Sequence, residues 1–420
     1  MKVMIDFLYT FLNFLQPGIL WPELEPYRPM LVIAILAAIS ALVWRRAEYS
    51  RLGQFSHPAF LFMTVFIAVQ VLSVYYSGVS SMFKEFERWH VPLLFAAISL
   101  MLINNAPALK RYVWGMMVGS MVVILFGLYA VYAELPNAVG GRAGAYGMYE
   151  NHNDYTFIIV MVLPFLFFFW SRHARGLRRL FLGVSVLACV AGVLFSLSRG
   201  GMLALILEIA LIVMWTRSGI KRVAAIVVLS IVGGGAAAYQ WAVREESQSN
   251  YTAAVAQYER IELWKAGLAM IKAHPFLGVG SRRFGEFSQQ YGEISGDNRG
   301  KNAHNTYVDI AATSGLIGLL SFLLFLRSVI RELRVRMTVA GYEWMDSIRL
   351  AALISLCTIM FRALLDVKSH DWSFYILASI AIVYGALRRH LEARNAATQS
   401  MSSAGESQKT MPNAGVAGQY

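Results

Sequence analysis

The sequence contains few charged residues and few cysteines. Only 15% of its 420 residues are charged and 57% are hydrophobic, whereas soluble domains average about 25% charged residues. A chain of this composition would expose too much apolar surface in water, so we expect lipid to be its solvent. The two cysteines, Cys189 and Cys357, lie inside apolar runs without metal-site spacing. They are therefore predicted to be two free, buried thiols.

Two further absences concern partners and targeting. The net charge is +12, but the basic residues come in short clusters between apolar runs. This pattern is typical of membrane topology rather than of a nucleic-acid-binding face. Lys2 precedes an apolar run that has no small-residue cleavage site, and Gln16-Pro17-Gly18 interrupts it. We interpret this run as a retained first helix rather than a signal peptide.

Long apolar intervals fill most of the chain. A helix that spans a bilayer needs roughly 20 apolar residues, with a range of about 17–25. The pattern predicts an all-α integral membrane protein with about twelve transmembrane helices, of which the first and fourth are short. The intervals are 4–20, 29–44, 58–76, 90–104, 111–133, 153–171, 178–197, 201–216, 222–243, 306–326, 347–366 and 373–388.

Lysine and arginine gather in every second connection between these intervals. Cytoplasmic connections are enriched in these residues, so the alternation supports the count of twelve and places both termini in the cytoplasm. The one long polar interval, 244–305, then faces the periplasm or the cell exterior. Residues 1–394 form one polytopic membrane domain in this interpretation. Residues 395–420, rich in small and polar residues, are expected to form a disordered cytoplasmic tail.

Local signals divide the polar interval further. Apolar residues recur at helical spacing from Ile261 to Ile271, which predicts an amphipathic helix over 257–273 on the membrane surface. His274-Pro275 should end that helix, and Gly278 and Gly280 should form the turn that follows. Residues 76–90 carry aromatic and charged side chains together and are interpreted as a second interfacial helix.

Arginines on the outer side require an explanation, because membrane topology does not favour them there. They are Arg142, Arg199, Arg260, Arg282 and Arg283. An arginine at a membrane boundary is often one that reaches toward lipid headgroups. Arg199, however, precedes Gly200 and Gly201, which permit close backbone approach and leave amides at a helix start for an anion. Several arginines from separate loops would suit a diphosphate.

Histidine and acidic residues complete the candidate site. His304 enters the interval 306–326 next to Asn305 and Tyr307, and a neutral imidazole can accept a proton from a hydroxyl. A second polar cluster, 149–154, includes His152, and a helix cap by Asn151 or Asn153 explains it slightly better than chemistry does. A third group is Asp366 with His370 and Asp371, which would orient an imidazole or balance arginine charge.

A catalytic metal is the less favoured alternative. Glu23 and Glu25, between Pro22 and Pro26, have the side chains to ligate a divalent cation, but ordinary loop acidity explains them equally well. No second pair of outer carboxylates reinforces them. Arginines can stabilise a phosphate leaving group in place of a metal. We therefore expect no metal and no cofactor.

Taken together, three motifs resemble those of the O-antigen ligase/polymerase superfamily. They are Ser-Arg-Gly-Gly after one helix, the Arg-x-x-x-Trp helix with its Pro-x-x-Gly-x-Gly turn, and His-Asn-x-Tyr before another helix; the similarity covers roughly residues 110–390. The resemblance implies a GT-C-type membrane glycosyltransferase that moves a glycan from undecaprenyl diphosphate. In the ligase branch the acceptor is a sugar of lipid A–core. The reaction is inverting and metal-independent, and it takes place on the periplasmic face of the bacterial inner membrane.

The resemblance also implies roles for particular residues. Arg199, Arg260 and His304 match the family's essential residues, and Asp366 is the best match to its late acidic residue. His304 would act as general base while arginines stabilise the departing diphosphate. The remaining candidates for substrate binding are Arg142, Arg282, Arg283, Asn305 and Tyr307. Polymerases and protein O-oligosaccharyltransferases of the superfamily stay open as alternatives, and so does a transporter of lipid-linked sugar.

Overall fold

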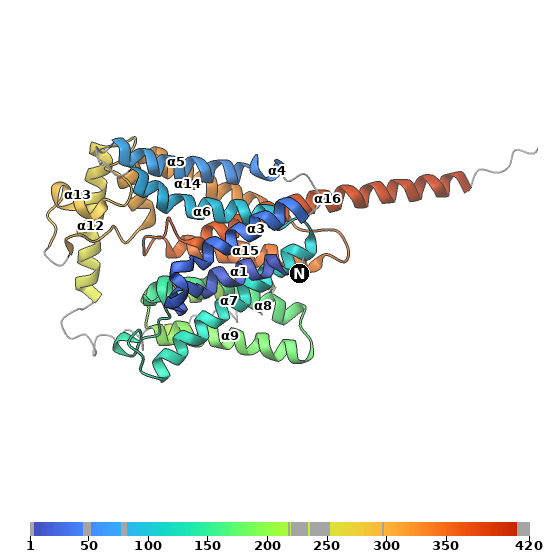
Figure 1. Cartoon of the computed structure of the whole chain (residues 1–420), viewed down its shortest axis with the longest axis horizontal. Coiled ribbons are helices and arrows are strands. Elements are labelled where there is room, and N and C mark those ends of the chain that lie inside the picture. The colour runs from blue at the N-terminus through green and yellow to red at the C-terminus, as the bar shows by residue number, and fades with distance from the viewer. Residues whose placement is uncertain are drawn as a thin grey trace, which may run out of the picture.

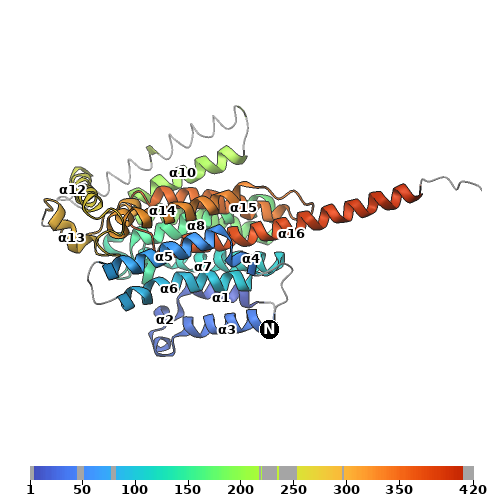
Figure 2. The same ribbon diagram turned by 90° about the horizontal axis from the view of Figure 1, so that it is seen from above.

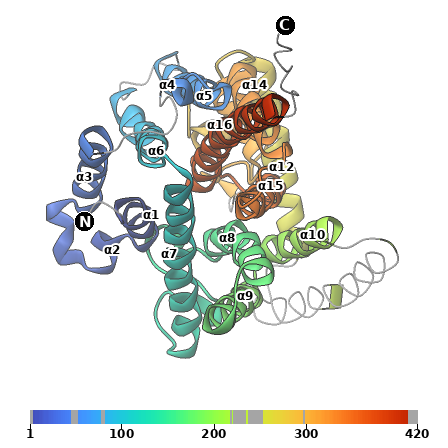
Figure 3. The ribbon, with the colours of Figure 1, turned by 90° about the vertical axis from the view of Figure 1, so that its right-hand side faces the viewer.

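The computed structural model describes residues 4–44, 52–76, 82–216, 253–295 and 298–409, besides 219, 234 and 235. All regular elements in this part of the chain are helices, as predicted, and most run nearly parallel in one bundle (Figures 1 and 3). The first elements are α1 (Ile5–Leu15), α2 (Pro17–Leu20), η1 (Pro22–Tyr27), α3 (Pro29–Trp44), α4 (Leu52–Phe55), α5 (Pro58–Tyr76), α6 (Met82–Leu102), α7 (Ala106–Tyr132), η2 (Val139–Gly141) and η3 (Gly147–Tyr149). They are followed by α8 (His152–Arg172), α9 (Gly176–Ser196), α10 (Arg199–Thr216), α12 (Ala253–Ala273), α13 (Phe284–Tyr291), α14 (Thr306–Arg334), α15 (Glu343–Arg362) and α16 (Trp372–Lys409).

Within the described residues, seven helices are long and apolar enough to cross a membrane: α5, α7, α8, α9, α10, α14 and α15. Shorter apolar helices cover Ile5–Leu15, Pro29–Val43 and Trp89–Leu102. The predicted interval 222–243 lies outside the described residues, and each of the other predicted intervals coincides with helix. A multi-pass membrane protein is therefore confirmed, whereas the count of twelve spans stays a prediction.

Several helices differ from the predicted intervals. The first interval is divided because Gln16 adopts a left-handed conformation (φ 49°) directly before Pro17. From residue 82 onward, the described part of the interfacial segment and the fourth interval form one helix, α6, and residues 82–91 contain no glycine or proline that would end it. Helix α16 continues to Lys409 and so includes residues 395–409, where alanine and other helix-forming residues recur; the disordered tail stays a prediction. Residues 410–420 lie outside the described part.

Helix α14 is broken in its interior at Gly315 (φ 70°, ψ −177°). The turn 275–280 docks against this break: the amides of Val279 and Gly280 donate to the carbonyls of Ala312 (3.0 Å) and Thr313 (2.9 Å). The amide of residue 316 donates in return to the carbonyl of residue 275 (2.7 Å). Backbone groups at membrane depth need such internal partners. The predicted Pro-x-x-Gly-x-Gly turn therefore completes an interrupted helix.

Helices α12 and α13 lie beyond one end of the bundle, where α12 runs across the direction of the long helices (Figures 1 and 2). The bundle's opposite end carries the start of α1 and the end of α16. A small core of its own, which includes Leu263, Met270 and Phe284, packs α12 and α13 onto the start of α14. The helix predicted over 257–273 is confirmed by α12, while its contact with a membrane surface stays a prediction.

Candidate active site

His304 and Asp366 meet at the end of the bundle where α12 lies. His304 lies two residues before the start of α14 in a left-handed conformation (φ 46°), and Asp366 follows α15. Their Nδ1 and Oδ1 atoms are 3.9 Å apart, with the histidine side chain 38% exposed and the carboxylate 15% exposed. Left-handed backbone is unfavourable for a residue with a Cβ and often marks functional sites. The fold thus places Asp366, which was predicted to orient an imidazole or to balance arginine charge, beside the imidazole of His304.

Thr306 ties the two segments to each other. Its hydroxyl donates to the carbonyl of Asp366 (2.7 Å) and accepts from the amide of Lys368 (2.9 Å). Its own amide donates to the carbonyl of Ala363 (2.8 Å). These bonds fix the start of α14 against the loop after α15. The hydroxyl and the amide of Thr306 therefore hold the backbone that carries His304 next to the backbone that carries Asp366.

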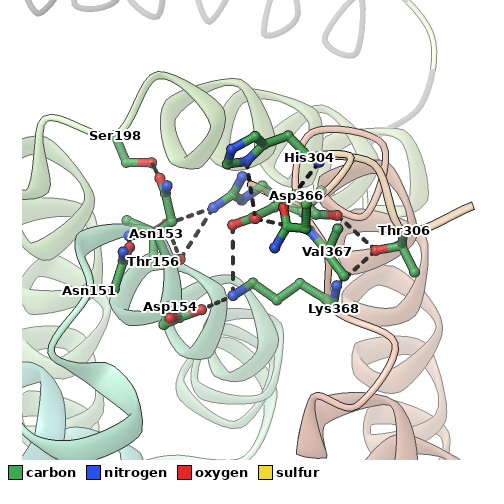
Figure 4. A network of polar contacts seen from close by, with 12 residues as sticks. Asn151, Asn153, Asp154, Thr156, Ser198, His304, Thr306, Asp366, Val367 and Lys368 are labelled. Carbon is green, nitrogen blue, oxygen red and sulfur yellow. Dashed lines mark hydrogen bonds and ion pairs between the residues drawn. The ribbon is translucent and has the colours of Figure 1, made fainter. Parts of the chain in front are cut away.

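Lys368 extends the network to α8. Its ammonium lies 3.7 Å from Asp366 Oδ2 and forms an ion pair with Asp154, while its side chain is 10% exposed. Figure 4 shows Asp366 between His304 and Lys368, with Asp154 on the far side of the lysine. Burial lowers the pKa of the Lys368 ammonium, and the nearby Asp371 carboxylate opposes that effect. The sequence analysis did not single out Lys368, since one lysine in a short loop carries no motif.

The starts of α8 and α10 meet beside this network and are joined by hydrogen bonds. Asn151 caps α8 through the amide of Asn153 (2.8 Å), as favoured from the sequence. Asn153 Oδ1 accepts a hydrogen bond from the Ser198 hydroxyl (2.7 Å; Figure 4). The same hydroxyl accepts from the amide of Gly201 (3.1 Å). The expectation of free amides for an anion is therefore wrong at Gly201, because Ser198 already occupies that donor.

The two glycines after Arg199 serve close packing. A Cβ at Gly200 would lie 2.5 Å from Nη1 of Arg362, and one at Gly201 would lie 2.8 Å from the Thr156 side chain. Arg362 is fully buried at the end of α15. Sequence reasoning missed it because it sits inside an apolar interval predicted as a span. The only available signal was a charged residue at the end of that interval.

Arg260 and Arg282 bring charge from the outer segment. Arg260, on α12, is close enough to Arg362 for their charges to interact. Arg282, in a left-handed turn (φ 61°), interacts electrostatically with Asp309 and His370.

A tryptophan on α12 holds the segment that leads to the candidate base. The indole of Trp264 donates to the carbonyl of Ala303 (2.9 Å), the residue directly before His304. Helix α12 therefore supplies an arginine to the site and also positions the imidazole.

Four other predicted site residues have contacts outside the network of His304, Asp366 and Lys368. Arg283 pairs with Glu286 (2.7 Å) and stacks over Phe287. Asn305 caps α14 through the amides of residues 307 and 308. The Tyr307 hydroxyl donates to the carbonyl of residue 360 (3.0 Å), and Arg142 Nε donates to the carbonyl of residue 196 (3.0 Å). Substrate binding by Asn305 and Tyr307 is therefore not favoured, because their polar groups hold helices together.

The remaining candidates have local partners as well. His152 Nδ1 lies 3.1 Å from the carbonyl of residue 143, and Asp371 caps α16 through the amide of residue 373 (2.9 Å). Glu23 and Glu25 are exposed in η1. No group of three histidine, cysteine or acidic side chains suited to a metal occurs among the described residues. Both cysteines are free, and Cys357 is only half-buried, unlike the prediction.

The middle of the chain matches a known family. Residues 184–323 match the family model described as O-antigen ligase. The chain carries an O-antigen ligase domain. This domain runs from within α9 to the second half of α14 and contains Arg199, Arg260 and His304. Asp366 and Lys368 lie beyond the matched residues. No curated protein matches the chain. The family match over residues 184–323 and the seven candidate spans are consistent with a membrane enzyme of the O-antigen ligase/polymerase type.

Proposed function

We propose that this protein transfers an O-antigen glycan from undecaprenyl diphosphate to a sugar hydroxyl of lipid A–core. The O-antigen ligase domain supports the reaction class. The observation that carries the proposal is the His304–Asp366 pair, 3.9 Å apart, at the same end of the bundle as Arg199 and Arg260. A base beside converging guanidinium groups is what transfer from a diphosphate to a hydroxyl requires.

The reaction follows from this arrangement in one displacement. Asp366 faces Nδ1 of His304, which leaves Nε2 to take the proton of the acceptor hydroxyl. The acceptor oxygen then attacks the anomeric carbon, and the bond from that carbon to the diphosphate oxygen breaks. Undecaprenyl diphosphate leaves with the bonding electron pair, its charge stabilised by Arg199 and Arg260. Attack opposite the leaving group inverts the anomeric centre.

The location of the site suits a lipid-linked donor. The polar network lies at helix ends, so a diphosphate would sit at the membrane surface while its polyprenyl tail extends between helices and membrane lipids. We infer from the basic connections that the opposite end of the bundle, with the start of α1 and the end of α16, faces the cytoplasm. The site is then periplasmic in the bacterial inner membrane, away from cytoplasmic nucleotide sugars. This proposal includes no metal, no cofactor and no nucleic acid.

Other functions share part of this pattern. A polymerase or a protein O-oligosaccharyltransferase of the same superfamily would use the same donor with a different acceptor. A transporter would place polar residues near the bilayer midplane, whereas the network described above lies at helix ends. The position of the network therefore favours an enzyme over a transporter.

The test is reconstitution of the purified protein with undecaprenyl-diphosphate-linked glycan and either lipid A–core or free glycan. Glycan on lipid A–core supports the proposed ligase, and chain growth alone indicates a polymerase. His304→Ala should abolish transfer while the protein still inserts and keeps its unfolding temperature. Undiminished transfer by this variant would falsify the assignment of the base.

A further inference from the structure

Arg362 is a buried cation at the base of the site. Its side chain is 1% exposed. Nη2 donates to the backbone carbonyl of Asn153 (3.2 Å) and to the hydroxyl of Thr156 (3.4 Å), both at the start of α8. Nη1 lies beneath Gly200, in the first turn of α10. Nε has no hydrogen-bond acceptor among the described residues. One guanidinium thus contacts the ends of two helices while one of its donors is unused.

The charge of Arg362 is also left without a direct partner. No described carboxylate lies within ion-pair distance of it, and Asp366 contacts Lys368 and His304. Asp366 and Asp371 act on the Arg362 charge from farther away, and Arg260 opposes them with a second positive charge. A buried ion without a contacting partner of opposite charge is unfavourable, and a buried arginine at the end of a predicted span is a candidate for function. An anion bound at this end of the bundle would add to the negative charge that Asp366 and Asp371 supply.

The contacts of Arg362 lead to Arg199. The carbonyl of Asn153 accepts from Arg362, and the side chain of Asn153 accepts from the Ser198 hydroxyl (2.7 Å). Arg199 is the next residue. Gly200 follows it and rests directly on the Arg362 guanidinium. Displacement of Arg362 would therefore shift the first turn of α10 through two contacts. One runs through Asn153 to Ser198, before Arg199, and the other is with Gly200, after it.

We propose that Arg362 is a positioning residue for the diphosphate of the donor. It holds the first turn of α10, and with it Arg199, against α8. The charge of Arg362 also contributes a positive electrostatic potential at the position proposed for the diphosphate. The side chain is covered by both helix ends, so it acts through Arg199 and through its field rather than by contact with the substrate. The inference rests on the proposed function, because that function supplies the diphosphate.

Three variants test the proposal, with binding of undecaprenyl diphosphate and steady-state transfer as the measurements. Arg362→Gln removes the charge and should weaken undecaprenyl diphosphate binding by about tenfold, a loss of about 1.4 kcal/mol. The KM for lipid A–core should stay within about twofold of wild type, because only donor binding changes. Arg362→Lys should recover part of the affinity, since it keeps the charge and loses the planar fork. Gly200→Ala should weaken donor binding without any change of charge.

A buried arginine at the other end of the same helix provides the control. Arg349 is 3% exposed and bonds to Asp346 (2.6 Å) and to the carbonyl of residue 333 (2.8 Å). Arg349→Gln should lower the unfolding temperature and leave undecaprenyl diphosphate affinity unchanged.

Two outcomes separate the inference from the proposed function. If Arg362→Gln, Arg362→Lys and Gly200→Ala lower only the unfolding temperature, as Arg349→Gln does, Arg362 is merely structural and the inference is overturned. Should Arg362→Gln fail to fold, unchanged donor affinity in the other two variants overturns it equally. Wild-type protein that transfers no glycan from the diphosphate donor refutes the proposed function itself.

Discussion

Replacing Asp366 by asparagine tests whether the carboxylate acts through His304. Asparagine keeps the shape of the side chain and removes its charge. The imidazolium that forms when His304 takes a proton then loses its nearest negative partner. Asp366 also contacts Lys368 (3.7 Å), whose second carboxylate partner, Asp154, remains. We therefore expect a folded protein with slower transfer.

The size of the effect follows from the geometry. Two unit charges 3.9 Å apart interact by about 4 kcal/mol at an effective dielectric constant of ~20. His304 is 38% exposed, so solvent screening reduces this to about 1–2 kcal/mol. The turnover number of Asp366→Asn should therefore fall by about 5- to 30-fold.

The assay is steady-state transfer to lipid A–core, with a double-mutant cycle. Asp371→Asn is the matched control: Asp371 lies in the same loop and caps α16 (2.9 Å), a role that asparagine also fills. It should keep at least about half of the wild-type rate, because asparagine retains the capping oxygen and the carboxylate that faces His304 is that of Asp366. In a His304→Ala background, Asp366→Asn should have no further effect, since coupled residues are non-additive. A further loss there, or equal losses in the two aspartate variants, would refute the reasoning.

The other predictions concern the broken helix and the surface arginine. Gly315→Ala forces a side chain into a backbone region that only glycine adopts readily, at a cost of about 1–3 kcal/mol, and into the backbone of Phe276. Its unfolding temperature should fall further than that of Gly300→Ala, which shares a positive φ (76°) but has open space around it; equal shifts would contradict the docking of the turn. Arg283→Ala should transfer glycan within about twofold of wild type, because an exposed ion pair such as that with Glu286 is worth about 0–1 kcal/mol. A tenfold loss would show that Arg283 binds substrate after all.

Much of the helical architecture was readable from composition and spacing. Pro58 and Tyr76 bound α5 as predicted, because both ends of that apolar run carry clear signals. The caps at Asn151 and Asn305 are local as well, since each side chain bonds amides two or three residues away. The interval 4–20 was the exception: its hydropathy is continuous, but the backbone turns at Gln16.

Only some residues of the candidate site could be found from the sequence. His304, Arg199 and Arg260 were identified by motif and lie within the residues that match the family model, whereas their roles remain proposals. Lys368 and Arg362 carry no motif and depend on neighbours more than 150 residues away in the chain. No local pattern predicts which side chains a lysine or arginine meets across a bundle.

The sequence by itself determined that this chain is a helical membrane protein with an O-antigen ligase domain, because hydropathy, charge alternation and local motifs are properties of neighbouring residues. Only the tertiary structure decided what surrounds the candidate base and what the glycines after Arg199 are for. Those answers depend on side-chain volume and on charges brought together from α8, α10, α14 and α15. Burial and electrostatic pairing act through space, so the packing of the helices sets them and the order of residues along the chain does not.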